Sequence, residues 1–184
     1  MACSCPYGYN MSETARGTAQ TLTSLLDIGN TYLGQRLDGL TDEEWLWEPV
    51  PGCWTLRDGT MDFAIPEPAP TPVTTIAWRL HHIQACNEVE LSWIRDEPVP
   101  WEDVQVPSSA DEGVGLWARS ANALRDAVGA MSDVDLEIAT ATVARYEPIL
   151  ALGLPRIYFA TTLVRENIHH GAEIGVLRDL YRNR

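Results

Sequence analysis

The chain has few basic residues, and this shortage limits the partners that it can bind. Its 184 residues include 13 Lys and Arg against 26 Asp and Glu, which gives a formal net charge of −13. Nucleic acids and anionic membrane surfaces are bound mainly through positive charge. We therefore expect neither of them as a partner.

Long apolar runs are also missing. No stretch approaches the roughly 20 apolar residues that a membrane-spanning helix needs. The opening MACSCPYGYN lacks the basic start and the apolar core of a secretory signal. From these absences we expect a cytoplasmic protein.

Several motifs of common enzyme and metal-binding classes are absent. The sequence contains no Gly-rich phosphate loop, no Gly-x-Ser-x-Gly and no His-Glu-x-x-His. Its four cysteines, at positions 3, 5, 53 and 86, do not form the paired Cys-x-x-Cys pattern of a zinc module. Nucleotide binding through such a loop, serine hydrolysis and zinc-protease chemistry are therefore disfavoured.

Helical patterns dominate what is present. Four long segments have helical periodicity, at about 12–37, 71–95, 109–130 and 156–182, and two short ones lie at 41–46 and 132–138. Long connections separate the first two long segments and precede the last one. The pattern predicts an all-α four-helix bundle with long crossover connections, a fold whose core readily hosts metal sites. We expect a flexible tail over residues 1–11 and one domain over residues 12–184.

The four histidines form two adjacent pairs, His81-His82 and His169-His170, each inside a long helical segment. Glu166 lies one turn before His170, so both side chains project from one side of the helix. A histidine from the other helix would complete a set of three ligands. Three protein ligands with an open position are typical of a catalytic metal site.

Helical phase distinguishes the members of each pair. His82 shares its face with apolar residues, and so do Glu166 and His170; His81 falls on a mostly polar face, and His169 falls on a charged row. A charge in an apolar stripe persists only if it is paired or bound to a metal. We therefore predict His82, Glu166 and His170 as ligands of a divalent metal, and His81 and His169 as surface residues.

A plainer interpretation stays open for each of these residues alone. A histidine on an apolar stripe is more often hydrogen-bonded in the core, and Glu166–His170 could be a simple i,i+4 pair. The three residues together favour a metal site.

Cys86 follows His82 by one turn, and a small buried hydrophobe is the more common role for it. Core packing is the commoner role for the tryptophans at 45, 47 and 54, although they could wall a pocket.

The stretches GLTDEEWLWEPVPGCWTLR, TTIAWRLHHI and ENIHHGAEIGVLRDLY resemble the DinB-like superfamily of metal-binding four-helix bundles. The resemblance covers nearly the whole chain apart from the cysteine-bearing tail. It implies one divalent metal held by His82 and His170, with Glu166 at a position where the family usually has His. Because it has a carboxylate at this position, the chain resembles the branch of mycothiol-dependent maleylpyruvate isomerases and thiol S-transferases.

The resemblance implies a function in which a metal-bound thiolate is the nucleophile. A low-molecular-weight thiol of the mycothiol or bacillithiol type would be added or transferred to an electrophilic small molecule, or would assist an isomerisation. Zn²⁺ suits the ligand set best, and Ni²⁺, Co²⁺, Fe²⁺ and Mn²⁺ are alternatives. A non-catalytic metal or small-molecule binding protein and a metal-dependent hydrolase are the other hypotheses. The protein could form a homodimer. Candidates for binding an anionic group are Arg57, Arg79 and Arg156.

Overall fold

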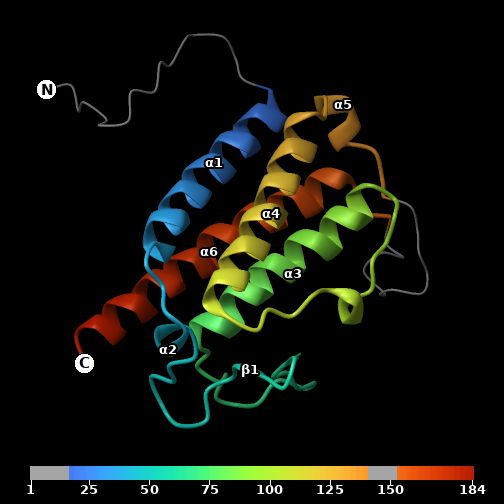
Figure 1. Cartoon of the computed structure of the whole chain (residues 1–184). Coiled ribbons are helices and arrows are strands. Elements are labelled where there is room, and N and C mark those ends of the chain that lie inside the picture. Colours follow the sequence, from blue (N-terminus) through green and yellow to red (C-terminus); the bar gives the residue numbers. More distant parts are fainter. Residues whose placement is uncertain (1–16, 141–152) are drawn as a thin grey trace, which may run out of the picture.

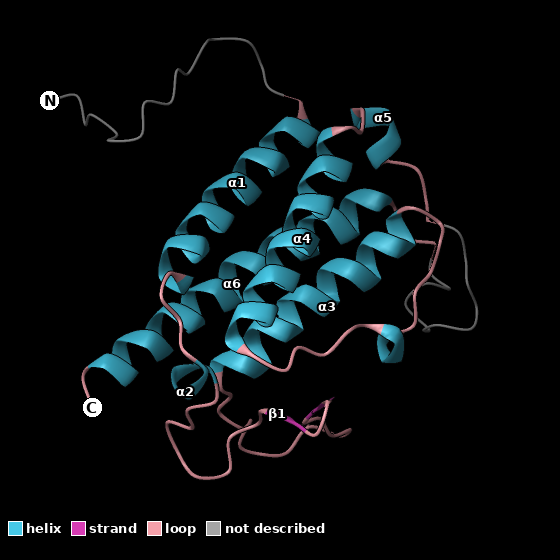
Figure 2. Cartoon of the chain, viewed as in Figure 1, coloured by secondary structure: helices cyan, strands magenta, loops and turns pink. Residues whose placement is uncertain are grey.

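The computed structural model describes residues 17–140 and 153–184. Its long helices are α1 (Thr18–Leu37), α3 (Ile76–Ile94), α4 (Ala110–Gly129) and α6 (Arg156–Arg182). Its short elements are α2 (Asp42–Trp45), the strands β1 (Leu56–Arg57) and β2 (Thr60–Met61), the 3-10 turn η1 (Trp101–Asp103) and α5 (Asp133–Leu136). The two strands form one antiparallel hairpin. The protein is thus an all-α four-helix bundle, as the sequence predicts (Figures 1 and 2).

Each long helix packs against two others: α1 and α3 both contact α4 and α6. The helices α1 and α6 run in one direction, and α3 and α4 run in the other (Figure 1). The connection between α3 and α4 therefore returns along the length of the bundle, beside α3. The connection between α1 and α3, which carries α2 and the hairpin, stays at one end of the bundle (Figure 1).

Local capping signals define most helix ends. The hydroxyls of Thr41, Ser109 and Ser132 accept hydrogen bonds from the third backbone N–H of α2, α4 and α5, respectively. Pro155 precedes α6 directly, as expected from the sequence. The predicted start of the second long helix at residue 71 is wrong, because α3 begins only after Thr75, whose hydroxyl caps it. The expected tail of residues 1–11 and the first residues of the segment 12–37 lie outside the described part of the chain.

Two large hydrophobic clusters fill the bundle, and a small third one surrounds Val89. One large cluster surrounds Leu26, Leu124 and Phe159, and the other surrounds Leu33, Ile83 and Ile174. Buried polar residues of α3, α4 and α6 also lie in the interior, among them a reciprocal amide pair between Asn87 and Asn167. In the described residues, no helix is long and apolar enough to cross a membrane.

Candidate metal centre

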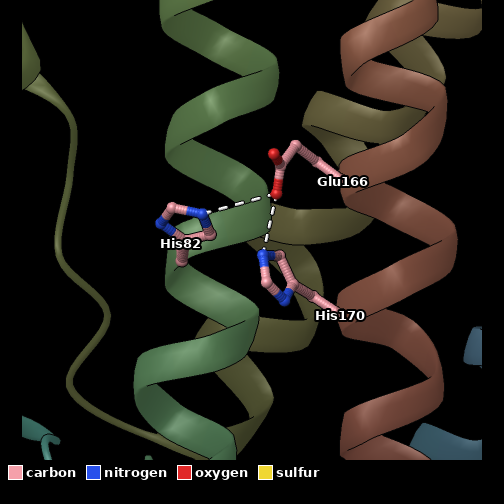
Figure 3. Close-up of side chains that lie close together, drawn as sticks. All are labelled: His82, Glu166 and His170. Atoms are coloured by element: carbon pink, nitrogen blue, oxygen red, sulfur yellow. Dashed lines mark ion pairs between the residues drawn. The ribbon is translucent and has the colours of Figure 1, made fainter. Parts of the chain in front are cut away.

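The helices α3 and α6 bring His82, Glu166 and His170 together (Figure 3). One ligand atom from each side chain lies within 4.8 Å of the other two. Glu166 Oε2 lies 2.8 Å from His170 Nε2 and 3.6 Å from His82 Nε2. The carboxylate therefore stands between two imidazoles, one from its own helix and one from the facing helix.

This cluster differs from an ordinary surface ion pair, because its carboxylate is both buried and ionised. Glu166 and His170 are buried, while the side chain of His82 keeps 23% of its surface exposed. Burial alone would raise the pKa of Glu166. Hydrogen bonds with His170 and His82, helped by the charges of His170 and Arg165, outweigh it and hold the pKa well below its ordinary value. The group is thus an ionised carboxylate, and His82 is the most exposed member of the cluster.

A second carboxylate fixes the ring of His170. Glu173 Oε2 lies 2.6 Å from His170 Nδ1, and Arg79 Nε lies 3.0 Å from the same oxygen. With Nδ1 engaged by Glu173, Nε2, which contacts Glu166, is the ring nitrogen left to bind a metal. This is the usual outer support of a metal-binding histidine. The sequence analysis missed Glu173, although its i+3 spacing from His170 could have indicated it.

The ring of His82 is held by an aromatic neighbour. Trp78, one turn earlier on α3, stacks on it with centroids 5.1 Å apart and planes 11° from parallel. The indole N–H of Trp78 donates to the backbone carbonyl of Asp62 at 2.7 Å, which fixes the tryptophan in turn. Buried Nδ1 of His82 has no hydrogen-bond partner among the described residues. His82 is therefore oriented mainly by stacking.

The other two histidines take different places. His169 is exposed, as predicted, and lies 3.3 Å from Glu173 Oε1. The prediction that His81 lies on the surface is wrong, because only 2% of it is exposed. The connection after α3 covers this side: Gln84, which pairs with His81, donates to the carbonyl of Gln105. Burial lowers the pKa of His81, so it is a neutral core histidine.

The remaining sequence candidates are also placed by the structure. Cys86 is buried in the core, with Sγ 3.5 Å from His82 Nε2, and it does not belong to the three-residue donor cluster. The three candidate arginines all have carboxylate partners: Arg57 pairs with Glu48 and Asp62, Arg79 with Glu173, and Arg156 with Asp96. Arg165, which contacts the second oxygen of Glu166, is the arginine that the sequence analysis missed.

The three tryptophans of the first connection divide between two roles. Trp45 is buried in the core, and Trp47 packs edge-on against Tyr181 near the end of α6. Trp54 instead lies beside Trp78, with ring centroids 5.8 Å apart. Only Trp54 is therefore near the cluster.

A third acid, Glu90, lies two turns after His82 on the same face of α3. Burial, followed by repulsion from Glu166, raises the pKa of Glu90 to about 8. One of its carboxyl oxygens is buried without a hydrogen-bond partner among the described residues. The sequence indicates this position only through the i+4 steps from His82 to Cys86 to Glu90.

We expect Glu90 to make the metal-free protein less stable as the pH rises. The folded protein keeps this proton up to about pH 8, whereas the unfolded chain loses it near its ordinary pKa of about 4.3. The folded state therefore binds more protons over this interval, and the free energy of unfolding falls from acid to neutral pH. Relative to wild type, Glu90→Gln should gain about 3–4 kcal/mol between pH 5 and pH 8. Urea unfolding in the presence of a chelator measures this, and a pH-independent difference would contradict it.

Comparison with known families assigns the fold. A search of curated proteins found no match to this chain. The family model of the DinB superfamily matches residues 25–174, which include all three clustered residues and most of the bundle. The chain belongs to the DinB superfamily.

Proposed function

We propose that His82, Glu166 and His170 bind one divalent metal ion. Two imidazoles and one carboxylate form a donor set that suits Zn²⁺ and accepts Ni²⁺, Co²⁺, Fe²⁺ or Mn²⁺. Glu166 supports the proposal because it is an ionised, buried carboxylate whose Oε2 pairs with two imidazole nitrogens, one from each helix. Arg165 lies on the other oxygen, Oε1.

We further propose that the protein is a metal-dependent enzyme that adds or transfers a low-molecular-weight thiol to an electrophilic small molecule. A divalent cation at this site would favour the thiolate over the thiol, so that a small thiol loses its proton at neutral pH. Three protein donors leave room for an exogenous ligand. The partial exposure of His82 gives a small molecule access to the cluster.

The chain's own residues then have separate tasks. Glu173 and Arg79 hold the ring of His170, and Trp78 holds the ring of His82. Arg165 is largely exposed beside Glu166, where it can attract an anionic group of the thiol or the substrate. In the reaction, the thiol loses its proton to solvent and its sulfur forms a bond to the electrophilic carbon. In a transfer, the bond from that carbon to the leaving group breaks; in an addition, a π bond of the electrophile opens and takes up a proton from solvent. The carboxylate of Glu166 supports placement near the mycothiol-dependent isomerase and S-transferase branch.

A thiol-and-electrophile screen tests this function. Metal-loaded protein is incubated with mycothiol, bacillithiol or glutathione and with monochlorobimane or chlorodinitrobenzene, and the conjugate is quantified. We expect conjugation with at least one thiol that is lost on chelation and in His82→Ala. The exposed variant His169→Ala is the matched control and should retain it. Metal-loaded protein that conjugates no thiol faster than buffer would contradict the proposed reaction, and hydrolysis of the electrophile without thiol would indicate a hydrolase instead.

We expect Glu166→Gln to weaken metal binding by at least about ten-fold, as changes around metal ligands commonly do. A neutral amide is a poorer partner for a divalent cation than a carboxylate is. Glu166→His should restore binding, because it supplies an imidazole at the same i−4 position. Calorimetric titration with Zn²⁺ measures both variants. Undiminished affinity in Glu166→Gln together with lost turnover would make Glu166 a general base rather than a ligand.

A further inference from the structure

Four aromatic rings extend away from the candidate metal centre on the His82 side. We call Phe63, Trp54, Trp78 and Trp101 the aromatic row. Trp78 stacks on His82, Trp54 lies 5.8 Å from Trp78, and Phe63 lies 6.2 Å from Trp54, all between ring centroids. Trp101 approaches His82 separately, with centroids 6.1 Å apart. The rings come from the segment between α1 and α3, from α3 itself, and from η1.

The two ends of the aromatic row are open to solvent. Phe63 is 66% exposed and Trp101 is 40% exposed, whereas Trp78 is buried. Large exposed aromatic surface beside a polar centre is typical of a ligand-binding site. The position of Trp101 indicates the ligand: because this exposed ring adjoins His82, a molecule held at the cluster would pack against it.

Other neighbours of the cluster have a different character. Glu166 contacts Arg165, and Glu173 contacts His170 and Arg79, whose guanidinium also lies over the Trp78 ring. These are charged and hydrogen-bonding groups, which suit the polar body of a small thiol. The exposed rings of the aromatic row, Phe63 and Trp101, suit an apolar planar group. The charged groups and the exposed rings thus match two different reactants.

We infer that the substrate that shares this site with the thiol is an electrophile with a planar aromatic or conjugated apolar portion, which packs against the aromatic row beside His82. This inference rests on the proposed metal centre and names the substrate class of the same site. Trp101 and Phe63 are its specificity-determining residues, since they are the exposed members of the row. Trp78 has a structural task as well, because it holds His82.

Binding of hydroxamates to the Co²⁺-loaded protein tests the inference without any turnover. Each hydroxamate can ligate the metal through the same head group, and Co²⁺ absorption reports the binding. Acetohydroxamate has no apolar tail, octanohydroxamate has a flexible one, and 2-naphthohydroxamate has a planar one. We expect the naphthyl probe to bind roughly ten-fold more tightly than either of the others, from ring packing.

Variants identify the residues that cause this preference. Trp101→Ala and Phe63→Ala should each reduce affinity for the naphthyl probe at least about three-fold and leave acetohydroxamate binding unchanged. Both side chains are exposed, so neither change should prevent folding. Trp47→Ala is the matched control, because its indole packs on Tyr181 and lies outside the aromatic row.

The outcomes separate the two proposals. Equal affinity for the three probes, or an undiminished naphthyl preference in both variants, would overturn the inferred substrate class while leaving the metal centre in place. Tight octanohydroxamate binding would refute the planar requirement. Failure of acetohydroxamate to change a Co²⁺ spectrum would count against the metal centre itself. If the protein prefers the naphthyl probe but conjugates no thiol, the inferred role of the aromatic row is retained and only thiol transfer is rejected.

Discussion

Replacing His82 or His170 with alanine should each weaken binding of a divalent metal by more than about 100-fold. Loss of an outer hydrogen-bonding partner of a metal ligand typically costs about 10- to 100-fold in affinity, so loss of a direct donor should cost more. His82 is the only donor of the cluster that α3 supplies, and His170 contributes the nitrogen that lies 2.8 Å from Glu166 Oε2. Titration with Zn²⁺ against a competing chelator dye measures the affinity.

The neighbouring histidines are matched controls with two different expected results. His169→Ala removes an exposed side chain and should change neither affinity nor stability noticeably. His81→Ala removes a buried ring and leaves Gln84 without that partner, so it should lower stability but keep the metal. Circular dichroism confirms that each variant is folded. Equal loss of metal affinity in His81→Ala and His82→Ala would show that the assignment of His82 is wrong.

Arg178→Met should destabilise the protein by about 3–5 kcal/mol, the usual cost of leaving a buried charge unpaired. Arg178 and Glu44 are both almost fully buried and form a two-pronged ion pair, with N–O distances of 2.7 and 2.8 Å. Arg178 also donates to the carbonyls of Arg36 and Asp38 at the end of α1. These carbonyls have no partner within the helix, so the arginine joins α1, α2 and α6 at one end of the bundle.

Two comparison variants test that explanation. Arg125→Met breaks the exposed pair with Asp27 and should cost less than about 1 kcal/mol, because solvent screens such pairs. The double variant Arg178→Met/Glu44→Leu should recover part of the loss, since no buried charge then stands alone. Chemical unfolding gives all three values. A cost for Arg178→Met no larger than that for Arg125→Met would contradict a structural role for the buried pair.

The sequence predicts those features of the fold that local chemistry determines. Ser109 and Pro155 mark helix starts correctly because a cap or a proline acts within a few residues. The predicted start of the second long helix at residue 71 is wrong, because Thr75 is the cap: its hydroxyl accepts from the Trp78 N–H.

The candidate site was partly predictable for the same reason. Helical phase brought Glu166 and His170 to one face, and it selected His82 from its pair; the structure places all three together. Helical phase did not predict the burial of His81. That burial depends on the connection after α3, which contacts the helix through residues distant in sequence. The raised pKa of Glu90 depends likewise on which side chains packing brings together. Glu173, in contrast, lies three residues after His170, and this local spacing could have indicated it.

The metal content of the purified protein tests the central claim most directly. Protein is dialysed against metal-free buffer, reloaded with Zn²⁺, Ni²⁺, Co²⁺, Fe²⁺ or Mn²⁺, passed through a desalting column and analysed by inductively coupled plasma mass spectrometry. The His82, Glu166 and His170 centre predicts one tightly held divalent ion per chain for at least one of these metals, and none in the double variant His82→Ala/His170→Ala. A folded wild-type protein that retains no metal above the buffer level, or a double variant that retains as much as wild type, would contradict the account.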